Sequence, residues 1–174
     1  MKNQFTMPYE ESGITLDFPD ERFFCFENCS GYTQYSGNYF KEMDAGWFDV
    51  ANKTLYLIEL KDFTLANIKD RANAETRVWD MVKKSIDSCA MLVSILINST
   101  PANVIQPCLP IVFDKSYQIR LLHIVKSEQH QKADIQFLND SFKIKFKAYK
   151  ELFGVSSSMI LTYEQAKRHY NFIK

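Results

Sequence analysis

The feature that most constrains the fold is a segment with the length of a β-strand. Its side chains are apolar on both faces, and charged residues follow directly at its end. Residues 55–58 read Leu-Tyr-Leu-Ile, and Glu59, Leu60 and Lys61 follow directly. A strand that is apolar on both faces has to lie inside a sheet that is covered on both sides. From residue 68 to 97, apolar side chains recur at three- and four-residue steps, which predicts a long amphipathic helix. A buried strand followed by such a helix indicates a layered fold of sheet and helices.

The rest of the chain alternates between strand and helix patterns. We expect strands at 14–18, 22–26, 43–50, 54–63, 109–113 and 117–125, a loop at 30–38, and helices at 68–97, 131–153 and from about Thr162, where Gln165 completes a capping box. The predicted fold is α/β (α+β), a single domain over residues 1–174 with a mixed central β-sheet flanked by helices. Its core spans about 20–153, and a helical tail follows at 154–174.

The composition indicates a globular protein without a general affinity for polyanions. Of the 174 residues, 46% are hydrophobic, and 21 basic residues balance 21 acidic residues to a net charge of zero. Any contact with nucleic acid must therefore use a local basic face. The sequence has neither an apolar run of about 18 residues nor the apolar core of a signal peptide. We expect no membrane partner and a cytoplasmic location.

The four cysteines do not have the spacing of a zinc site. Cys25 and Cys29 are four residues apart, and Cys89 and Cys108 supply neither a second matching pair nor a histidine cluster. A free cysteine behaves as a small hydrophobic residue. We therefore expect reduced and mostly buried thiols, which are typical of a reducing compartment such as the cytoplasm.

The charge at the end of the central strand shares one face with an acidic residue of the preceding strand. Glu59 and Lys61 are two residues apart, so both point to one face, whereas Leu60 points to the other. If residues 52–53 form a two-residue loop, Asp44 lies opposite Lys61 and within diagonal reach of Glu59. The pattern thus predicts that two carboxylates and one ammonium group converge.

The identity of the first carboxylate depends on the register of the hairpin. In the register above, Asp49 lies opposite Tyr56, on the face away from Glu59. A slip of one residue would move every side chain to the other face and bring Asp49, instead of Asp44, beside Glu59. We expect Asp44 and keep Asp49 as the alternative.

Two carboxylates beside an ammonium group can support metal-dependent hydrolysis. Mg²⁺ takes oxygen ligands and often needs only one or two protein carboxylates besides water and substrate phosphate. Asp44 and Glu59 would hold the ion, which polarises the phosphate and lowers the pKa of a bound water. Lys61 would orient or deprotonate that water, or balance charge in the transition state. The alternative is a surface ion pair at a strand end, with Asp44 as a turn residue.

The series of an aspartate, a tight hairpin, an apolar strand ending in Glu59-Leu60-Lys61 and a following helix resembles the PD-(D/E)xK nuclease superfamily, which has the restriction-endonuclease-like fold. In that family the hairpin belongs to the core sheet. The resemblance, which covers about residues 20–125, implies a metal-dependent nuclease that hydrolyses phosphodiester bonds of DNA or RNA with Mg²⁺ or Mn²⁺. It implies metal ligation by Asp44, Glu59 and the backbone carbonyl of Leu60, with Lys61 as a catalytic residue.

Two features depart from the family pattern. Met43 stands where the family name has proline, and no clear helix is predicted before the hairpin to carry the upstream acidic ligand of many members. Glu27, after the strand at 22–26, is the candidate for that ligand. The alternative function is a non-catalytic member of the same fold that serves as a nucleic-acid- or protein-binding module.

A basic stripe on the second long helix is a secondary candidate. Lys143, Lys147 and Lys150 recur at four- and three-residue steps and could follow a phosphate backbone, although a solvated helix side has the same pattern. We expect nucleic acid as the partner, with a protein partner or a homodimer as further alternatives. His123, in an apolar strand, is expected to be a hydrogen-bonded histidine of the sheet.

Overall fold

The computed structural model describes residues 7–37 and 40–174, in which short strands at the start of the chain give way to long helices. The elements are β1 (Tyr9–Glu11), β2 (Ile14–Leu16), β3 (Phe23–Phe24), η1 (Phe26–Asn28), α1 (Ser30–Ser36), β4 (Ala45–Asp49), β5 (Thr54–Asp62), α2 (Arg71–Leu96), α3 (Ala102–Ile105), η2 (Gln106–Cys108), β6 (Gln118–Lys126), η3 (Gln129–Gln131), α4 (Lys132–Leu152), β7 (Val155–Thr162) and α5 (Tyr163–His169).

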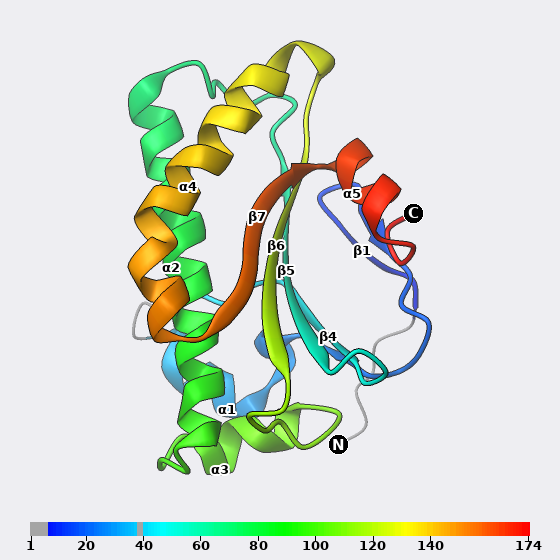
Figure 1. Cartoon of the computed structure of the whole chain (residues 1–174), viewed down its shortest axis with the longest axis vertical. Coiled ribbons are helices and arrows are strands. Elements are labelled where there is room, and N and C mark those ends of the chain that lie inside the picture. The colour runs from blue at the N-terminus through cyan, green and yellow to red at the C-terminus, as the bar shows by residue number, and fades with distance from the viewer. Residues whose placement is uncertain (1–6, 38–39) are drawn as a thin grey trace.

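The central sheet is mixed and has the strand order β3-β4-β5-β6-β7. β3, β4 and β5 pair antiparallel, whereas β5, β6 and β7 pair parallel. Parallel neighbours need a crossover connection, and α2 and α4 supply the two crossovers. The two helices lie side by side on one face of the sheet, and α5 and the small β1–β2 sheet lie on the other (Figure 1). The predicted single α+β domain with helices flanking a mixed sheet is confirmed.

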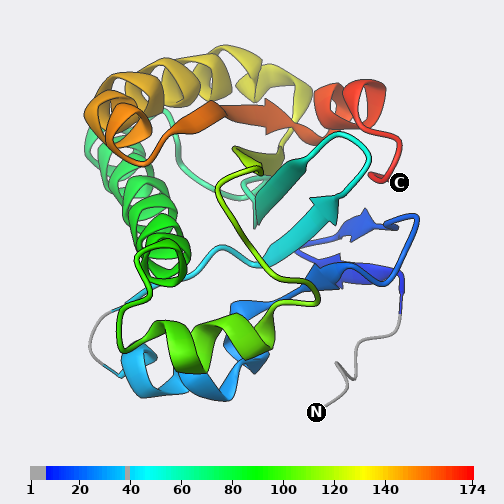
Figure 2. The same ribbon diagram turned by 60° about the horizontal axis from the view of Figure 1, so that its bottom comes forward.

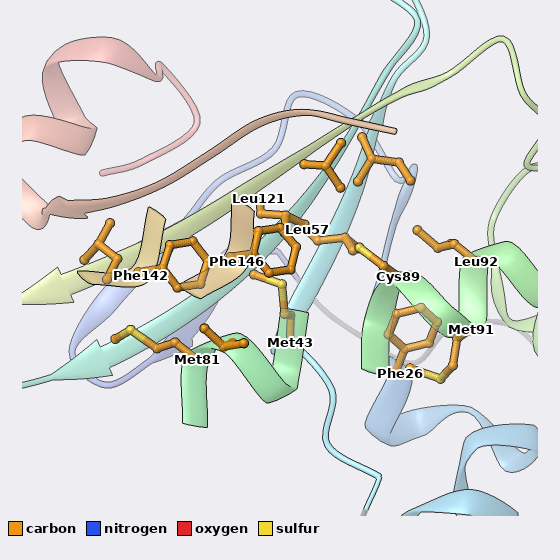
Figure 3. Close-up of a cluster of buried hydrophobic side chains, with 14 of the residues drawn as sticks. Phe26, Met43, Leu57, Met81, Cys89, Met91, Leu92, Leu121, Phe142 and Phe146 are labelled. Carbon is orange, nitrogen blue, oxygen red and sulfur yellow. The ribbon is translucent and has the colours of Figure 1, made fainter. Parts of the chain in front are cut away.

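The alternation of side chains along β5 divides the buried residues into two cores. Leu55 and Leu57 belong to the larger core, beneath α2 and α4. Figure 3 labels Leu57 there, among side chains of both helices such as Phe146. Tyr56 and Ile58 point to the smaller core, under the β1–β2 sheet and the C-terminal segment, which Figure 2 shows on the far side from α2. β5 is therefore buried on both faces, as its sequence predicts.

The long helix and the last helix begin where the sequence supplies caps. Asp70 precedes α2, and its carboxylate accepts a hydrogen bond from the Asn73 N–H at 2.9 Å. Thr162 precedes α5 and forms the expected capping box with Gln165. None of the described helices combines the length and the apolar character needed to cross a lipid bilayer.

Three predicted elements are wrong. The loop at 30–38 contains α1, because packing against α3 stabilises a helix that its polar sequence does not indicate. The strand at 109–113 is absent, since Pro110 lacks an N–H and the Gln106 side chain hydrogen-bonds the carbonyl of Ile111 at 3.1 Å. The helical tail at 154–174 begins with β7, an edge strand beside β6 whose serines tolerate partial exposure.

The prediction of four reduced cysteines is also wrong. Cys29 and Cys108 form a disulfide, with Cα atoms 5.4 Å apart and a sequence separation of 79. The bond joins the residue before α1 to the end of η2, and these two segments meet where α1 packs on α3. Cys25 and Cys89 are buried free thiols, as expected.

Candidate functional site

The β4–β5 hairpin brings Asp44 to the face of Glu59 through a register that differs from the predicted one. Ala45 pairs with Ile58, and residues 50–53 form a four-residue connection instead of a two-residue loop. The register is therefore shifted by two residues. Because side chains alternate with a period of two, a shift of two leaves the face of Asp44 unchanged.

Asp49 lies at the turn and away from Glu59. It pairs with Thr54 at the far end of the hairpin. Its carboxylate accepts hydrogen bonds from the backbone N–H of Asn52 at 3.1 Å and from the Asn52 side chain at 2.6 Å. Asp49 thus serves the turn, and the structure brings Asp44 to Glu59.

Asp44 occupies the point where the β4–β5 ladder ends. Its Oδ2 accepts a hydrogen bond from the Leu60 N–H at 2.7 Å. This side-chain bond takes the place of the next backbone hydrogen bond between β4 and β5, just before β4 begins. The preceding residue is tied to α2, because the Met43 N–H donates to the Ser88 hydroxyl at 2.9 Å. Both the sheet and the long helix therefore position the Asp44 carboxylate.

A lysine of α2 completes the cluster. Lys84 Nζ lies 3.2 Å from Asp44 Oδ1 and 2.7 Å from Glu59 Oε1. Lys61 Nζ lies 2.6 Å from the same Glu59 oxygen, from the solvent side. Two carboxylates and two ammonium groups meet here, and the Glu59 side chain is completely buried. Sequence reasoning missed Lys84, although its position three residues after the buried Met81 was a signal that it faces the sheet.

Burial and mutual repulsion dominate the electrostatics of Glu59. Burial raises the pKa of Glu59 to about 7, and the negative charge of Asp44 adds to the rise, against the lowering effect of Lys84 and Lys61. Burial lowers the pKa of Lys84, but Glu59 and Asp44 outweigh it and raise that pKa above its usual value. The cluster therefore holds its lysine charged, whereas its buried glutamate titrates near neutral pH.

His123 is a neutral structural neighbour of this cluster. It lies beside Glu59 in the parallel register of β5 and β6, and its Nε2 is 3.0 Å from the Ser85 hydroxyl. Burial, then the charges of Lys84 and Lys61, lowers the pKa of His123 to about 3. The expectation of a hydrogen-bonded sheet histidine is confirmed.

Glu42 is a second acidic residue that sequence reasoning missed. It is half-buried, and its carboxylate accepts a hydrogen bond from the Tyr32 hydroxyl of α1. Burial raises the pKa of Glu42, Lys84 lowers it, and Asp44 raises it. The signal for Glu42 in the sequence is its position, two residues before Asp44.

The remaining predicted ligands have other partners. The carbonyl of Leu60 accepts a hydrogen bond from the Ser12 hydroxyl at 3.3 Å, at the strand end where Asp44 binds the Leu60 N–H. Glu27 lies in η1, is exposed, and accepts a hydrogen bond from the Asn28 side chain at 3.2 Å. Within residues 7–37 and 40–174, no group of three or more His, Cys, Asp and Glu residues is arranged to hold a metal ion.

An open pocket runs along the seam between the end of β5 and α2. Alternate residues of β5 and of the segment that follows it line the pocket, together with residues of α2 at helical spacing and one residue of the segment before β4. The lining carries four basic and two acidic side chains, so it has a net positive charge although the whole chain is neutral. The lining residues are Lys41, Glu59, Lys61, Phe63, Arg77, Asp80, Met81 and Lys84.

The basic stripe of α4 is separate from this pocket. Lys143 and Lys147 are exposed and Lys150 is half-buried, and none of the three lines the pocket. The described contacts therefore do not connect the stripe to the Asp44–Glu59 cluster.

Comparisons of the chain with models of protein families, with curated proteins and with solved structures find no match. The resemblance to the PD-(D/E)xK superfamily therefore stays a prediction, and the function has to be argued from the geometry of the Asp44–Glu59 cluster and its pocket.

Proposed function

We propose that this chain is a divalent-metal-dependent nuclease of the PD-(D/E)xK type, with a restriction-endonuclease-like fold, that hydrolyses phosphodiester bonds of DNA or RNA. The observation that carries the proposal is that Asp44 and Glu59 share one cation, the Lys84 ammonium group, at the end of a buried strand that continues to Lys61. Two adjacent carboxylates repel each other unless a cation lies between them. The net positive pocket beside them suits a phosphate group.

The oxygen donors are of the type that Mg²⁺ or Mn²⁺ prefers. Asp44 and Glu59 would hold the ion, and the carbonyl of Leu60 is a third oxygen at the same strand end. The Lys84 ammonium contacts both carboxylates, so the space between them already accommodates positive charge. A bound ion would polarise the phosphate and lower the pKa of a water.

The two lysines have different roles in this proposal. Lys61 is partly exposed at the pocket and 2.6 Å from Glu59, so it would orient the attacking water and offset charge on the reacting phosphate. Lys84 is mostly buried and bridges Asp44 and Glu59, so it would favour the ionised form of Glu59 and hold the two carboxylates at the correct spacing. Glu27, which is exposed in η1, is not needed as a ligand.

One observation favours a second candidate, a non-catalytic member of the same fold that binds nucleic acid or protein. Lys84 already neutralises Asp44 and Glu59, and the Leu60 carbonyl already has a donor in Ser12. In this case Lys84 would permanently replace the metal ion, and the pocket would serve for binding alone. Nucleic acid is the proposed partner of the nuclease; a protein partner or a homodimer belongs to this second candidate.

A cytoplasmic location remains part of the proposal. The Cys29–Cys108 disulfide removes the argument from reduced cysteines, because disulfides are rare in a reducing compartment.

The deciding experiment incubates the purified chain with single-stranded DNA, duplex DNA and RNA, with Mn²⁺, with Mg²⁺ or with EDTA. We expect metal-dependent cleavage by the wild type, loss of cleavage in Glu59→Gln and Lys61→Ala, and retained cleavage in the matched control Lys115→Ala, which changes an exposed lysine of the turn before β6. Unchanged cleavage by Lys61→Ala would refute the role of Lys61. Binding of a nucleic acid without any cleavage would establish the second candidate instead.

A further inference from the structure

Of the four cations that the structure describes in the pocket between β5 and α2, one has no carboxylate partner among the described residues. The three lysines of its lining are paired with Glu59 or Asp80 at distances of 2.6 to 2.9 Å. Arg77 forms no ion pair with any residue that the structure describes, and its Nε is buried without a hydrogen-bond partner. A buried donor without an acceptor is unfavourable, so an anion that supplied an acceptor to Arg77 would remove this cost.

An aromatic ring holds the Arg77 guanidinium in place. Its Cζ lies 4.9 Å from the centre of the Phe63 ring, and Phe63 is 2% exposed. Phe63 is itself anchored to the sheet, because its N–H donates to the Lys126 carbonyl at 2.8 Å. A ring at this distance restrains the guanidinium through a cation–π contact, and the rigid fork of guanidinium donors matches the oxygens of a phosphate. Arg77 is therefore restrained in the pocket lining, and its guanidinium offers donors of the kind that bind a phosphate group.

The spacing along the pocket separates this group from the proposed reacting phosphate. Arg77 and Lys84 are seven residues apart on α2, which corresponds to roughly 10 Å along a helix axis. On the opposite side, Phe63 and Glu59 are four residues apart, or roughly 13 Å along an extended strand. These backbone spacings leave room for two phosphate groups in series, one at Arg77 and one at Glu59 and Lys61.

We propose that Arg77 is a second phosphate subsite, which binds a phosphate of a nucleotide next to the phosphodiester that is cleaved at Glu59 and Lys61. This inference rests on the proposed function and deepens it, because it makes the ligand an oligonucleotide rather than a single nucleotide. Arg77 is a positioning residue: it holds the strand in the pocket and does not contact the reacting atoms.

The test measures binding without metal ion, so that cleavage plays no part. A short fluorescein-labelled single-stranded DNA is titrated with wild type, Arg77→Gln and Arg77→Lys in EDTA, and fluorescence anisotropy gives Kd at several salt concentrations. Arg71→Gln is the matched control, because Arg71 is an exposed arginine of the same helix outside the pocket. We expect Kd to rise about tenfold in Arg77→Gln and to change little in Arg71→Gln.

Two further readouts keep the inference falsifiable. Loss of one phosphate contact on a single strand reduces the slope of log K against log salt by about 0.7, and we expect this change in Arg77→Gln only. Arg77→Lys keeps the charge but loses the fork and should give an intermediate Kd, which excludes misfolding as the cause. Equal Kd values and slopes for Arg77→Gln and Arg71→Gln would overturn the subsite, even if the wild type cleaves DNA. Arg77-dependent binding without cleavage would sustain the subsite and refute the nuclease.

Discussion

Lys84, in the middle of α2, lies 2.7 Å from Glu59 near the end of β5, and this ion pair connects the helix layer to the sheet beneath it. The pair is largely buried, since the Glu59 side chain is 0% exposed and that of Lys84 is 19% exposed. Since Lys84 also reaches Asp44, a single side chain of the helix determines how the two carboxylates of the candidate site are held.

Removal of Lys84 should destabilise the fold, because it leaves two carboxylates close together without their shared buried cation. Breaking a buried pair from one side costs about 3–5 kcal/mol, and we expect a loss of that order in the free energy of unfolding of Lys84→Met, measured by urea denaturation. The control is Lys83→Met, whose more exposed ion pair with Asp87 should contribute less than about 1 kcal/mol.

The double variant Glu59→Gln/Lys84→Met tests whether the two residues act through each other. A neutral amide at position 59 no longer requires a cation, so the double variant should be more stable than the sum of the two single losses implies. Additive losses would show that Lys84 stabilises the protein through some other contact.

The stability of the protein should depend on pH through Glu59. Its pKa is raised from 4.5 to about 7, chiefly by burial, so the folded state binds the proton more tightly than the unfolded state. This contribution is fully present below about pH 4.5 and is lost as the pH rises through about 7, by an amount on the order of 3 kcal/mol. We expect urea denaturation to give a steeper decline between these values for the wild type than for Glu59→Gln. Parallel curves would contradict the assignment.

The disulfide predicts a defined pattern of thiol labelling. After unfolding in urea without reductant, iodoacetamide should modify Cys25 and Cys89 alone, and after reduction it should modify all four cysteines, as mass spectrometry can count. Reduction of the bond, which encloses a long segment of chain, should lower the free energy of unfolding by about 2–4 kcal/mol. Labelling of four cysteines without reductant would show that the bond does not form.

Two glycines of the α1 region form a matched pair for a packing test. A Cβ on Gly31 would collide with the backbone carbonyl of Val104, whereas a Cβ on Gly37 would meet no described atom within 4 Å. Gly31→Ala should therefore lower the free energy of unfolding by about 1–3 kcal/mol, and Gly37→Ala should leave it nearly unchanged or raise it slightly. Equal thermal unfolding midpoints for the two variants would contradict the close packing of α1 on α3.

Local patterns were sufficient for the main elements. The helical period at 68–97 corresponds to α2 at Arg71–Leu96, and the predicted capping box marks the start of α5. The serine-rich β7 and the polar α1 were missed, because a neighbouring strand or helix stabilises each of them and their own residue pattern does not. The predicted two-residue loop was wrong, yet the face of Asp44 was right, because the error in register was an even number of residues.

The sequence by itself determined that Glu59 and Lys61 lie on one face at the end of a doubly buried strand, because alternation along a strand is a local property of the backbone. Only the tertiary structure decided that Lys84 joins Asp44 to Glu59, that Arg77 lies over the Phe63 ring with no anionic partner among the described residues, and that Cys29 meets Cys108. These contacts depend on how α2 crosses the sheet and how α1 packs on α3. Side-chain spacing within one element cannot specify the distance between two elements, since that distance is set by the packing of the whole core.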